Sequence, residues 1–245
     1  MSITPFLIAL QFLTCLPIRL AGMPTPQQLG RSQLWYPVVG ALLGAVLWGL
    51  SALLSGTPLL LHAALLLVAW VILSGALHLD GLADTADAWL GGLGNRERTL
   101  IIMKDPRSGP IAVVTLVLLL LLKFAALMAL LEQGQGPALL LAPWLARTLL
   151  PLLFLSTPYV RVGGLGQALS EHLPRQILPW VLGAHGVAML LLGWEGLLAL
   201  SCALLLFAWL RWRMIVRLGG TTGDTAGAMV ELVEALVLVA LALTL

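Results

Sequence analysis

Three aspartates, Asp80, Asp84 and Asp87, follow a long apolar run at intervals of four and three residues. On a helix this spacing places all three side chains on one face. No Lys or Arg occurs between Arg31 and Arg96, so no basic residue nearby in the sequence neutralises them. Carboxylates without thiols or clustered imidazoles suit a hard divalent cation such as Mg²⁺, which bridges carboxylates to substrate phosphates. The spacing therefore predicts a magnesium site formed by the three aspartates, with one of them acting as a base.

Basic residues follow this acidic face directly in the sequence. The stretch that begins at Arg96 supplies Arg98, Lys104 and Arg107 within twelve residues. Carboxylates for a metal beside cations for phosphate oxygens are typical of phosphoryl transfer. We predict that Lys104 is catalytic together with the aspartates, and that Arg96, Asp105 and Arg107 bind the substrate. The alternative for Arg96 and Arg98 is that they only set the orientation of the chain in a membrane.

A second polar cluster precedes the C-terminus, where a glycine-rich loop feeds the last apolar segment. Asp224, Glu231 and Glu234 project to one side of a helix in this segment. Asp224 is predicted to contact substrate and Glu231 to ligate metal. Lys123 and Arg147 fall inside other apolar segments, where an ionisable side chain needs a partner or a wet cavity. They are predicted to reach the substrate, although pairing with the two glutamates explains them equally well.

Composition makes this a membrane protein. Hydrophobic residues form 60% and charged residues 10% of the 245 positions, whereas soluble domains carry about 25% charged residues. The mean hydropathy is +1.02. The net charge of +2, with no basic stripe, excludes a nucleic-acid partner, and the two cysteines are too few for a disulfide framework or a zinc site.

The apolar segments predict an all-α fold, a polytopic bundle of transmembrane helices. Unpaired backbone cannot face lipid, so each span must be helical. The N-terminal segment 1–18 is short for a span and is predicted to form an interfacial or re-entrant helix. The whole chain, 1–245, is expected to be a single integral membrane domain. Seven spans are predicted, at about 37–56, 58–79, 110–131, 137–157, 177–193, 196–213 and 227–245.

Basic residues divide the connections between these spans into two alternating sets. Four connections carry Lys or Arg, namely 19–36, 80–109, 158–176 and 211–226, whereas those near 57, 132–136 and 194–195 carry none. Such alternation favours a cytoplasmic location for the basic set. We therefore expect a multi-pass protein of the inner membrane, with the loop 80–109 carrying the active site on the cytoplasmic side.

Three stretches of this chain together resemble the cobalamin synthase family. In order they are HLDGLADTADA, IMKDPRSG with Lys123 downstream, and RLGGTTGDTAGAMVELVEA. The stretches ALQFLTCLPI and WYPVVGALLGA also look like the opening of that family. The resemblance spans nearly the whole chain, and its three motifs occur in the family's order.

The resemblance implies a Mg²⁺-dependent membrane transferase that completes the nucleotide loop of cobalamin. Such an enzyme would join adenosylcobinamide-GDP to α-ribazole, or to its 5′-phosphate, and release GMP. A homo-oligomer, or association with other cobalamin-assembly enzymes, is left open. Two other functions compete: a secondary transporter that uses the intramembrane charged residues, and a phosphotransferase similar to the CDP-alcohol enzymes with another acceptor.

Overall fold

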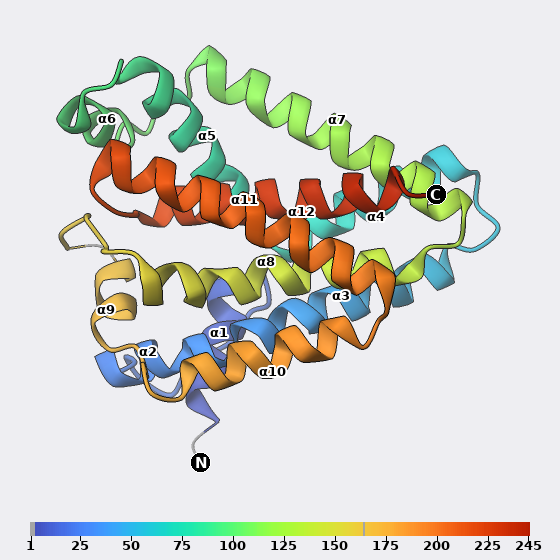
Figure 1. Ribbon diagram of the computed structural model, residues 1–245, viewed down its shortest axis with the longest axis horizontal. Coiled ribbons are helices and arrows are strands. Elements are labelled where there is room, and N and C mark those ends of the chain that lie inside the picture. Colours follow the sequence, from blue (N-terminus) through green and yellow to red (C-terminus); the bar gives the residue numbers. More distant parts are fainter. Residues whose placement is uncertain (1–2, 164) are drawn as a thin grey trace.

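In the computed structural model residues 3–163 and 165–245 are described, and this part of the chain is helical without a β-strand (Figure 1). The all-α prediction is therefore confirmed. The first helices along the chain are α1 (Thr4–Leu13), α2 (Pro26–Ser32), the 3₁₀ helix η1 (Gln33–Trp35), α3 (Tyr36–Leu53) and α4 (Leu59–Leu73). They are followed by α5 (Leu77–Gly91), α6 (Arg96–Ile102), α7 (Pro110–Glu132), α8 (Gly136–Ser156), α9 (Leu165–Glu171), α10 (Leu178–Leu190), α11 (Trp194–Leu218) and α12 (Gly223–Ala242).

Five helices of the described chain are long and apolar enough to cross a membrane. They are Pro26–Leu53, which includes α3, and the helices α7, α8, α11 and α12. Helices α4 and α5 pass the same test only as a pair, and they are bent by 87° relative to each other. The structure thus supports a multi-pass protein with five spans, or six if the bent pair counts as one. The predicted count of seven is not confirmed.

Two of the predicted spans account for this difference. The span 58–79 is interrupted at Gly75 and Ala76, whose φ angles of 66° and 55° lie in the left-handed region that ends a helix. Helix α5 then starts in a new direction and does not continue the path of α4. The span 177–193 contains only the 13-residue helix α10, which is about 20 Å long against a hydrocarbon core of about 30 Å. Hydropathy registers neither the backbone break nor the early helix end.

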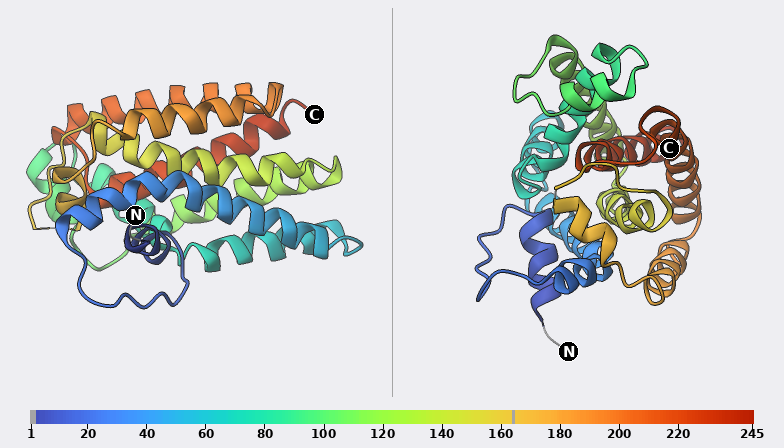
Figure 2. Two further views of the ribbon diagram at one scale, coloured as in Figure 1. Left: turned by 90° about the horizontal axis from the view of Figure 1, so that it is seen from below. Right: turned by 90° about the vertical axis from the view of Figure 1, so that its left-hand side faces the viewer.

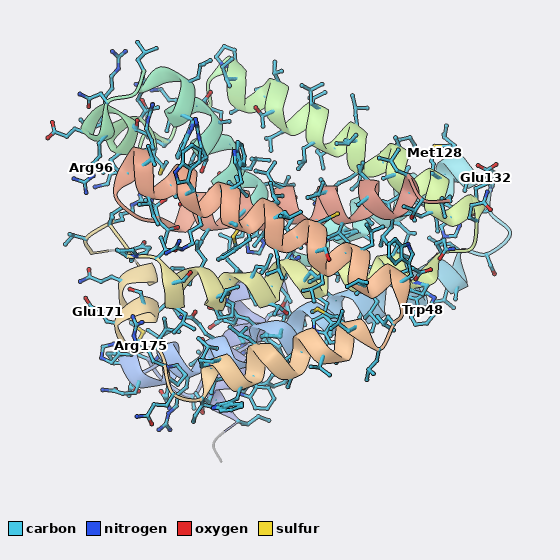
Figure 3. The ribbon with its side chains drawn as sticks, viewed as in Figure 1. Trp48, Arg96, Met128, Glu132, Glu171 and Arg175 are labelled. Atoms are coloured by element: carbon cyan, nitrogen blue, oxygen red, sulfur yellow. The ribbon has the colours of Figure 1, made fainter. Side chains whose placement is uncertain are left out.

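The connections that carry Lys or Arg gather at one end of the bundle. Helices α2, α6 and α9 and the start of α12 lie at this end, and the turns after α3, α7 and α10 lie at the other (Figure 1). Arg96, Glu171 and Arg175 mark the first end, and Trp48 and Glu132 the second (Figure 3). We call the first the charged end. Its composition agrees with the alternation in the sequence, and its cytoplasmic orientation stays a prediction.

Helices α8 and α12 form the interior of the bundle. Within the most apolar stretch of each helix, 78% of α8 and 72% of α12 is buried, against 28% of α7 and of α11. Helix α3 packs closely on α8, because a Cβ at Gly40 would lie 2.6 Å from the carbonyl oxygen of Pro143. Small residues commonly permit such close approach between membrane helices. The outer helices therefore present their apolar side chains to lipid around this central pair.

The short helix α1 lies across the bundle instead of along it. It is seen nearly end-on in the left panel of Figure 2. The ring of Phe6 on α1 packs edge-on against Trp35, with 5.3 Å between ring centroids. With 10 residues, α1 extends about 15 Å and cannot cross a bilayer. This agrees with the short, non-spanning N-terminal helix that the sequence predicts.

Candidate active site

Helices α5 and α12 cross with their backbones almost in contact. A Cβ added at Gly81 would lie 2.8 Å from the backbone oxygen of Asp224, and one at Gly227 would lie 3.3 Å from Cα of His78. Only glycine allows so close a crossing at Gly81, because the opposing atom is backbone and cannot swing away. The crossing brings the acidic face of α5 beside the N-terminus of α12.

Two loops of the charged end pair beside this crossing. The backbone N–H of Val160 donates to the carbonyl oxygen of Thr221 at 2.9 Å, and the N–H of Thr221 donates to the carbonyl oxygen of Pro158 at 2.8 Å. Gly220 makes room for this pairing, since a Cβ there would collide with the Pro158 oxygen. The pairing fixes the segment after α8 against the segment before α12.

An ion pair follows from this pairing. Nη1 of Arg161 lies 2.7 Å from Oδ2 of Asp224, and their side chains are 31% and 17% exposed. Because both groups remain partly accessible, the Arg161 guanidinium is placed to bind an anion as well as its own carboxylate partner.

The crossing and the loops enclose a cavity of about 540 Å³. This volume is typical of small-molecule binding sites. Four Asp, Lys or Arg side chains of the charged end line it: Asp80, Lys104, Arg161 and Asp224. Of the three aspartates on the predicted acidic face, Asp80 therefore lines the cavity, where it meets two other predicted site residues, Asp224 and Lys104.

Asp84 is half-buried next to this cavity. Partial burial and then the charges of neighbouring carboxylates raise its pKa to about 6, and the nearby Arg161 only partly offsets the rise. The neighbouring carboxylates are those of Asp80, Asp224 and Asp87. Negative charge is thus in excess on this side of the cavity, and a bound cation would relieve the repulsion.

Asp87 has a structural partner for each of its oxygens. Oδ1 accepts a hydrogen bond of 2.9 Å from the backbone N–H of Ala112, and Oδ2 accepts one from that of Gly109. These groups form the first turn of α7, whose N-cap residue Gly109 has no side chain of its own. A carboxylate at a helix N-terminus satisfies free N–H groups and the helix dipole. Asp87 therefore anchors α7 to α5.

The predicted phosphate-binding residues divide into two groups. Lys104 lines the cavity. Arg107 forms an ion pair of 2.7 Å with Asp105 and is 87% exposed, outside the cavity lining, and it lowers the pKa of Asp105 to about 2. Nε of Arg96 donates to the Leu218 carbonyl at 2.7 Å, at the end of α11. Of these residues only Lys104 faces the cavity.

The intramembrane charged residues form a buried cluster of their own. Nζ of Lys123 lies 2.6 Å from a carboxylate oxygen of Glu231 and 2.5 Å from one of Glu234, and Arg147 pairs with Glu234. All four side chains are at most 4% exposed. Glu231 lies seven residues beyond Asp224 on α12, a rise of about 10 Å. The structure therefore matches the pairing alternative for Lys123, Arg147 and both glutamates.

A metal ion at Asp80 and Asp84 would have to take most of its ligands from water and substrate. Among the residues that the structure describes, no three His, Cys, Asp or Glu side chains form a ready metal-binding group. Mg²⁺ usually takes one or two carboxylates and completes its shell with waters and substrate phosphates. The excess of negative charge around Asp84 would favour the binding of a cation there.

Comparison with known proteins identifies the family. The model of the family described as cobalamin-5-phosphate synthase matches residues 5–242. The chain belongs to this family. A relative from Ectopseudomonas mendocina, named adenosylcobinamide-GDP ribazoletransferase, is 69% identical over 238 residues, covering 97% of this chain and 98% of its own. A relative of the same name from Pseudomonas aeruginosa strain PAO1 is 68% identical over 242 residues, covering 99% of each chain. No solved structure matches.

Sequence reasoning missed one charged residue in the cavity of this cobalamin-5-phosphate synthase family member. Arg161 is assigned from sequence only to the orientation of the chain, because its partner Asp224 is 63 positions away. Two turn residues, Pro158 and Gly220, offered a signal that the flanking loops bend sharply. Nothing in the sequence pattern showed that the loops pair with each other.

Substitution Gly81→Ala is expected to reduce transferase activity by at least about tenfold, because the added Cβ would separate α5 from α12 by part of an ångström. Turnover and the melting temperature in detergent check this, with Gly49→Ala on α3 as control, where nothing lies within 4 Å of the added Cβ. Equal activity of both variants would show that the crossing does not set the geometry of the site.

Proposed function

We propose that the chain transfers a phosphate-linked cobinamide from adenosylcobinamide-GDP to α-ribazole or its 5′-phosphate, and releases GMP. The observation that carries this is the meeting of acidic and basic side chains in one cavity: Asp80, Asp224, Lys104 and Arg161, with Asp84 adjacent. The substrates follow from the name adenosylcobinamide-GDP ribazoletransferase, which relatives 69% and 68% identical to this chain carry.

The chemistry requires one bond to form and one to break. A ribazole hydroxyl oxygen bonds to the phosphorus that carries the cobinamide, and the bond from this phosphorus to the bridging oxygen breaks. The bridging oxygen leaves with GMP, and the hydroxyl proton passes to a carboxylate of the site. Lys104 and Arg161 hold positive charge against the phosphate oxygens, where negative charge accumulates.

Asp80 and Asp84 would hold Mg²⁺ in this proposal. Bound there, the ion would neutralise charge on the pyrophosphate and on the leaving GMP. Support comes from their separation by four residues on one helix face and from the raised pKa of Asp84. Asp87 contributes by fixing α5 to the start of α7, so that the loop with Lys104 is tied down at its far end.

Purified protein in detergent is expected to convert adenosylcobinamide-GDP and α-ribazole to a corrinoid product and GMP only when Mg²⁺ is present. Removing Mg²⁺ with EDTA should abolish GMP release, and adding it back should restore it. Asp80→Asn should raise the Mg²⁺ concentration needed for half-maximal rate by about tenfold or more, since one charged ligand is lost. Uptake of the corrinoid by proteoliposomes without GMP release would instead support a transporter.

The proposed setting is the inner membrane, with the charged end in the cytoplasm. The alternation of basic connections supports this, and so does their gathering at one end of the bundle (Figure 1). The intramembrane cluster gives the transporter alternative no support, because its two cations and two carboxylates are paired with one another.

A further inference from the structure

The cavity at the α5–α12 crossing has a second chemical character besides its charged groups. Four aromatic side chains also line it, and we call them the aromatic wall: Phe12, Tyr36, Phe154 and Tyr159. They come from α1, α3, α8 and the loop after α8. The proposed phosphoryl transfer uses none of them, so their convergence calls for a ligand group of its own.

The aromatic wall consists of two ring pairs. The rings of Phe12 and Tyr36 are stacked, with centroids 6.1 Å apart and planes at 20°, and those of Phe154 and Tyr159 are 6.1 Å apart at 42°. Pairs of rings that face a shared cavity offer flat surfaces to a flat ligand. The wall therefore favours a planar aromatic group over a flexible chain.

A buried polar atom without a partner accompanies the wall. His78 lines the same cavity and is 4% exposed, and its Nδ1 has no hydrogen-bond partner among the described residues. Buried polar atoms are nearly always satisfied in folded proteins, and an exception points to a missing ligand or water. An aromatic ligand with a ring nitrogen would supply that partner.

The aromatic wall adjoins the charged side chains. Tyr159 lies two residues before Arg161 and is held by the same backbone pairing to Thr221. A ring on the wall would thus leave an attached sugar beside the carboxylates and Arg161.

Size separates the two substrates of the proposed reaction. A benzimidazole nucleoside is a drug-sized molecule, which a cavity of about 540 Å³ encloses. A corrin ring carrying GDP is several times larger, so most of it must stay outside. The enclosed aromatic part of the cavity therefore matches the smaller substrate.

We propose that the aromatic wall binds the benzimidazole base of α-ribazole and that the imidazole of His78 donates a hydrogen bond to its free ring nitrogen. This inference rests on the proposed function, because it takes the acceptor nucleoside from there. It adds the place where that nucleoside binds, and it directs the ribose hydroxyls toward Asp80 and Asp224.

The first test replaces one ring of the wall. Phe154→Leu is expected to weaken α-ribazole binding by about five- to tenfold, measured by equilibrium dialysis without adenosylcobinamide-GDP. The KM for α-ribazole should rise by a similar factor, with the KM for adenosylcobinamide-GDP unchanged within about twofold. Phe207→Leu is the matched control, since Phe207 is also buried, at 8% against 5% exposed, but does not line the cavity.

The outcomes separate this inference from the proposed function. Wild-type protein that binds α-ribazole, with Phe154→Leu weakened, but does not release GMP would contradict the function and support the site. Normal turnover with unchanged α-ribazole binding in Phe154→Leu would overturn the site alone. A rise in the KM for adenosylcobinamide-GDP instead would assign the wall to the corrinoid.

The second test addresses His78 by a ratio that does not depend on the amount of folded protein. The wild type is expected to bind α-ribazole up to about tenfold tighter than the same nucleoside with indole in place of benzimidazole, because indole lacks the accepting nitrogen. His78→Leu should bring this ratio close to one. A ratio unchanged from wild type would show that His78 does not contact the base.

Discussion

Asp84→Asn is expected to lower the rate of GMP release by about 10²- to 10⁴-fold, the range typical of losing an essential acid–base or charge-stabilising group. The substitution keeps the shape of the side chain and removes its charge. The loss should persist at saturating concentrations of both substrates, because the missing carboxylate would act on the reacting phosphate through the Mg²⁺ that it helps to hold. Single-turnover measurement of GMP in detergent tests this, with Glu97→Gln, an exposed residue of the neighbouring helix α6, as control.

The thermal stability of Asp84→Asn should not fall with its activity. The pKa of Asp84 is raised to about 6 in the folded protein, above its ordinary value of 3.8. Its ionised form is therefore disfavoured by folding, and this cost is present above about pH 6 and disappears as pH falls below about 4. The Asp84→Asn side chain carries no such charge, so the melting temperature of this variant at neutral pH should equal or exceed that of wild type. Near-normal GMP release, or an unfolded variant, would contradict the role assigned to Asp84.

Lys123→Met is expected to destabilise the protein by about 3–5 kcal/mol, the usual cost of removing one partner from a buried ion pair. Lys123 contacts Glu231 and Glu234 at 2.6 and 2.5 Å, and neither glutamate is more than 4% exposed. Without Lys123, Arg147 alone would face two buried carboxylates. Thermal or denaturant unfolding in detergent measures the loss.

A double substitution distinguishes charge imbalance from lost packing. Lys123→Met combined with Glu231→Met leaves the pair of Arg147 and Glu234 intact and balanced. Buried ion pairs replaced by apolar residues of similar size often cost little. The double variant should therefore recover most of the stability that Lys123→Met loses. Equal destabilisation in both would show that packing around Lys123, including its position 5.1 Å from the Trp70 ring centroid, matters more than charge.

The helix class and the acidic face could be predicted because both depend on local periodicity. Asp80 and Asp84 lie on α5 at the spacing that the sequence shows, and Asp224 lies in the first turn of the last helix. The sequence also named both partners of each intramembrane ion pair, but it left their pairing as one of two alternatives. The choice depended on which helices pack together, and the structure places α7 and α8 against α12 through these contacts.

The features that sequence reasoning missed depend on contacts between distant segments or on backbone conformation. Arg161 reaches Asp224 only because the loops on either side of it pair through backbone groups. The role of Asp87 as the cap of α7 depends on where Gly109 falls in space. The break at Gly75 and Ala76 includes a left-handed conformation at Ala76 that a residue other than glycine rarely adopts, and a single glycine within an apolar run does not reveal it.

The basic connections lie at one end of the bundle, and the turns after α3, α7 and α10 lie at the other (Figure 2). The cavity is lined by residues of the charged end, so reactants and products exchange with a single aqueous compartment. The site need not open alternately to two sides, and no solute has to pass through the protein. Under the proposed function, the lipid holds the helices in place, and the opposite end of the bundle, where short turns join the helices, takes no part in the reaction.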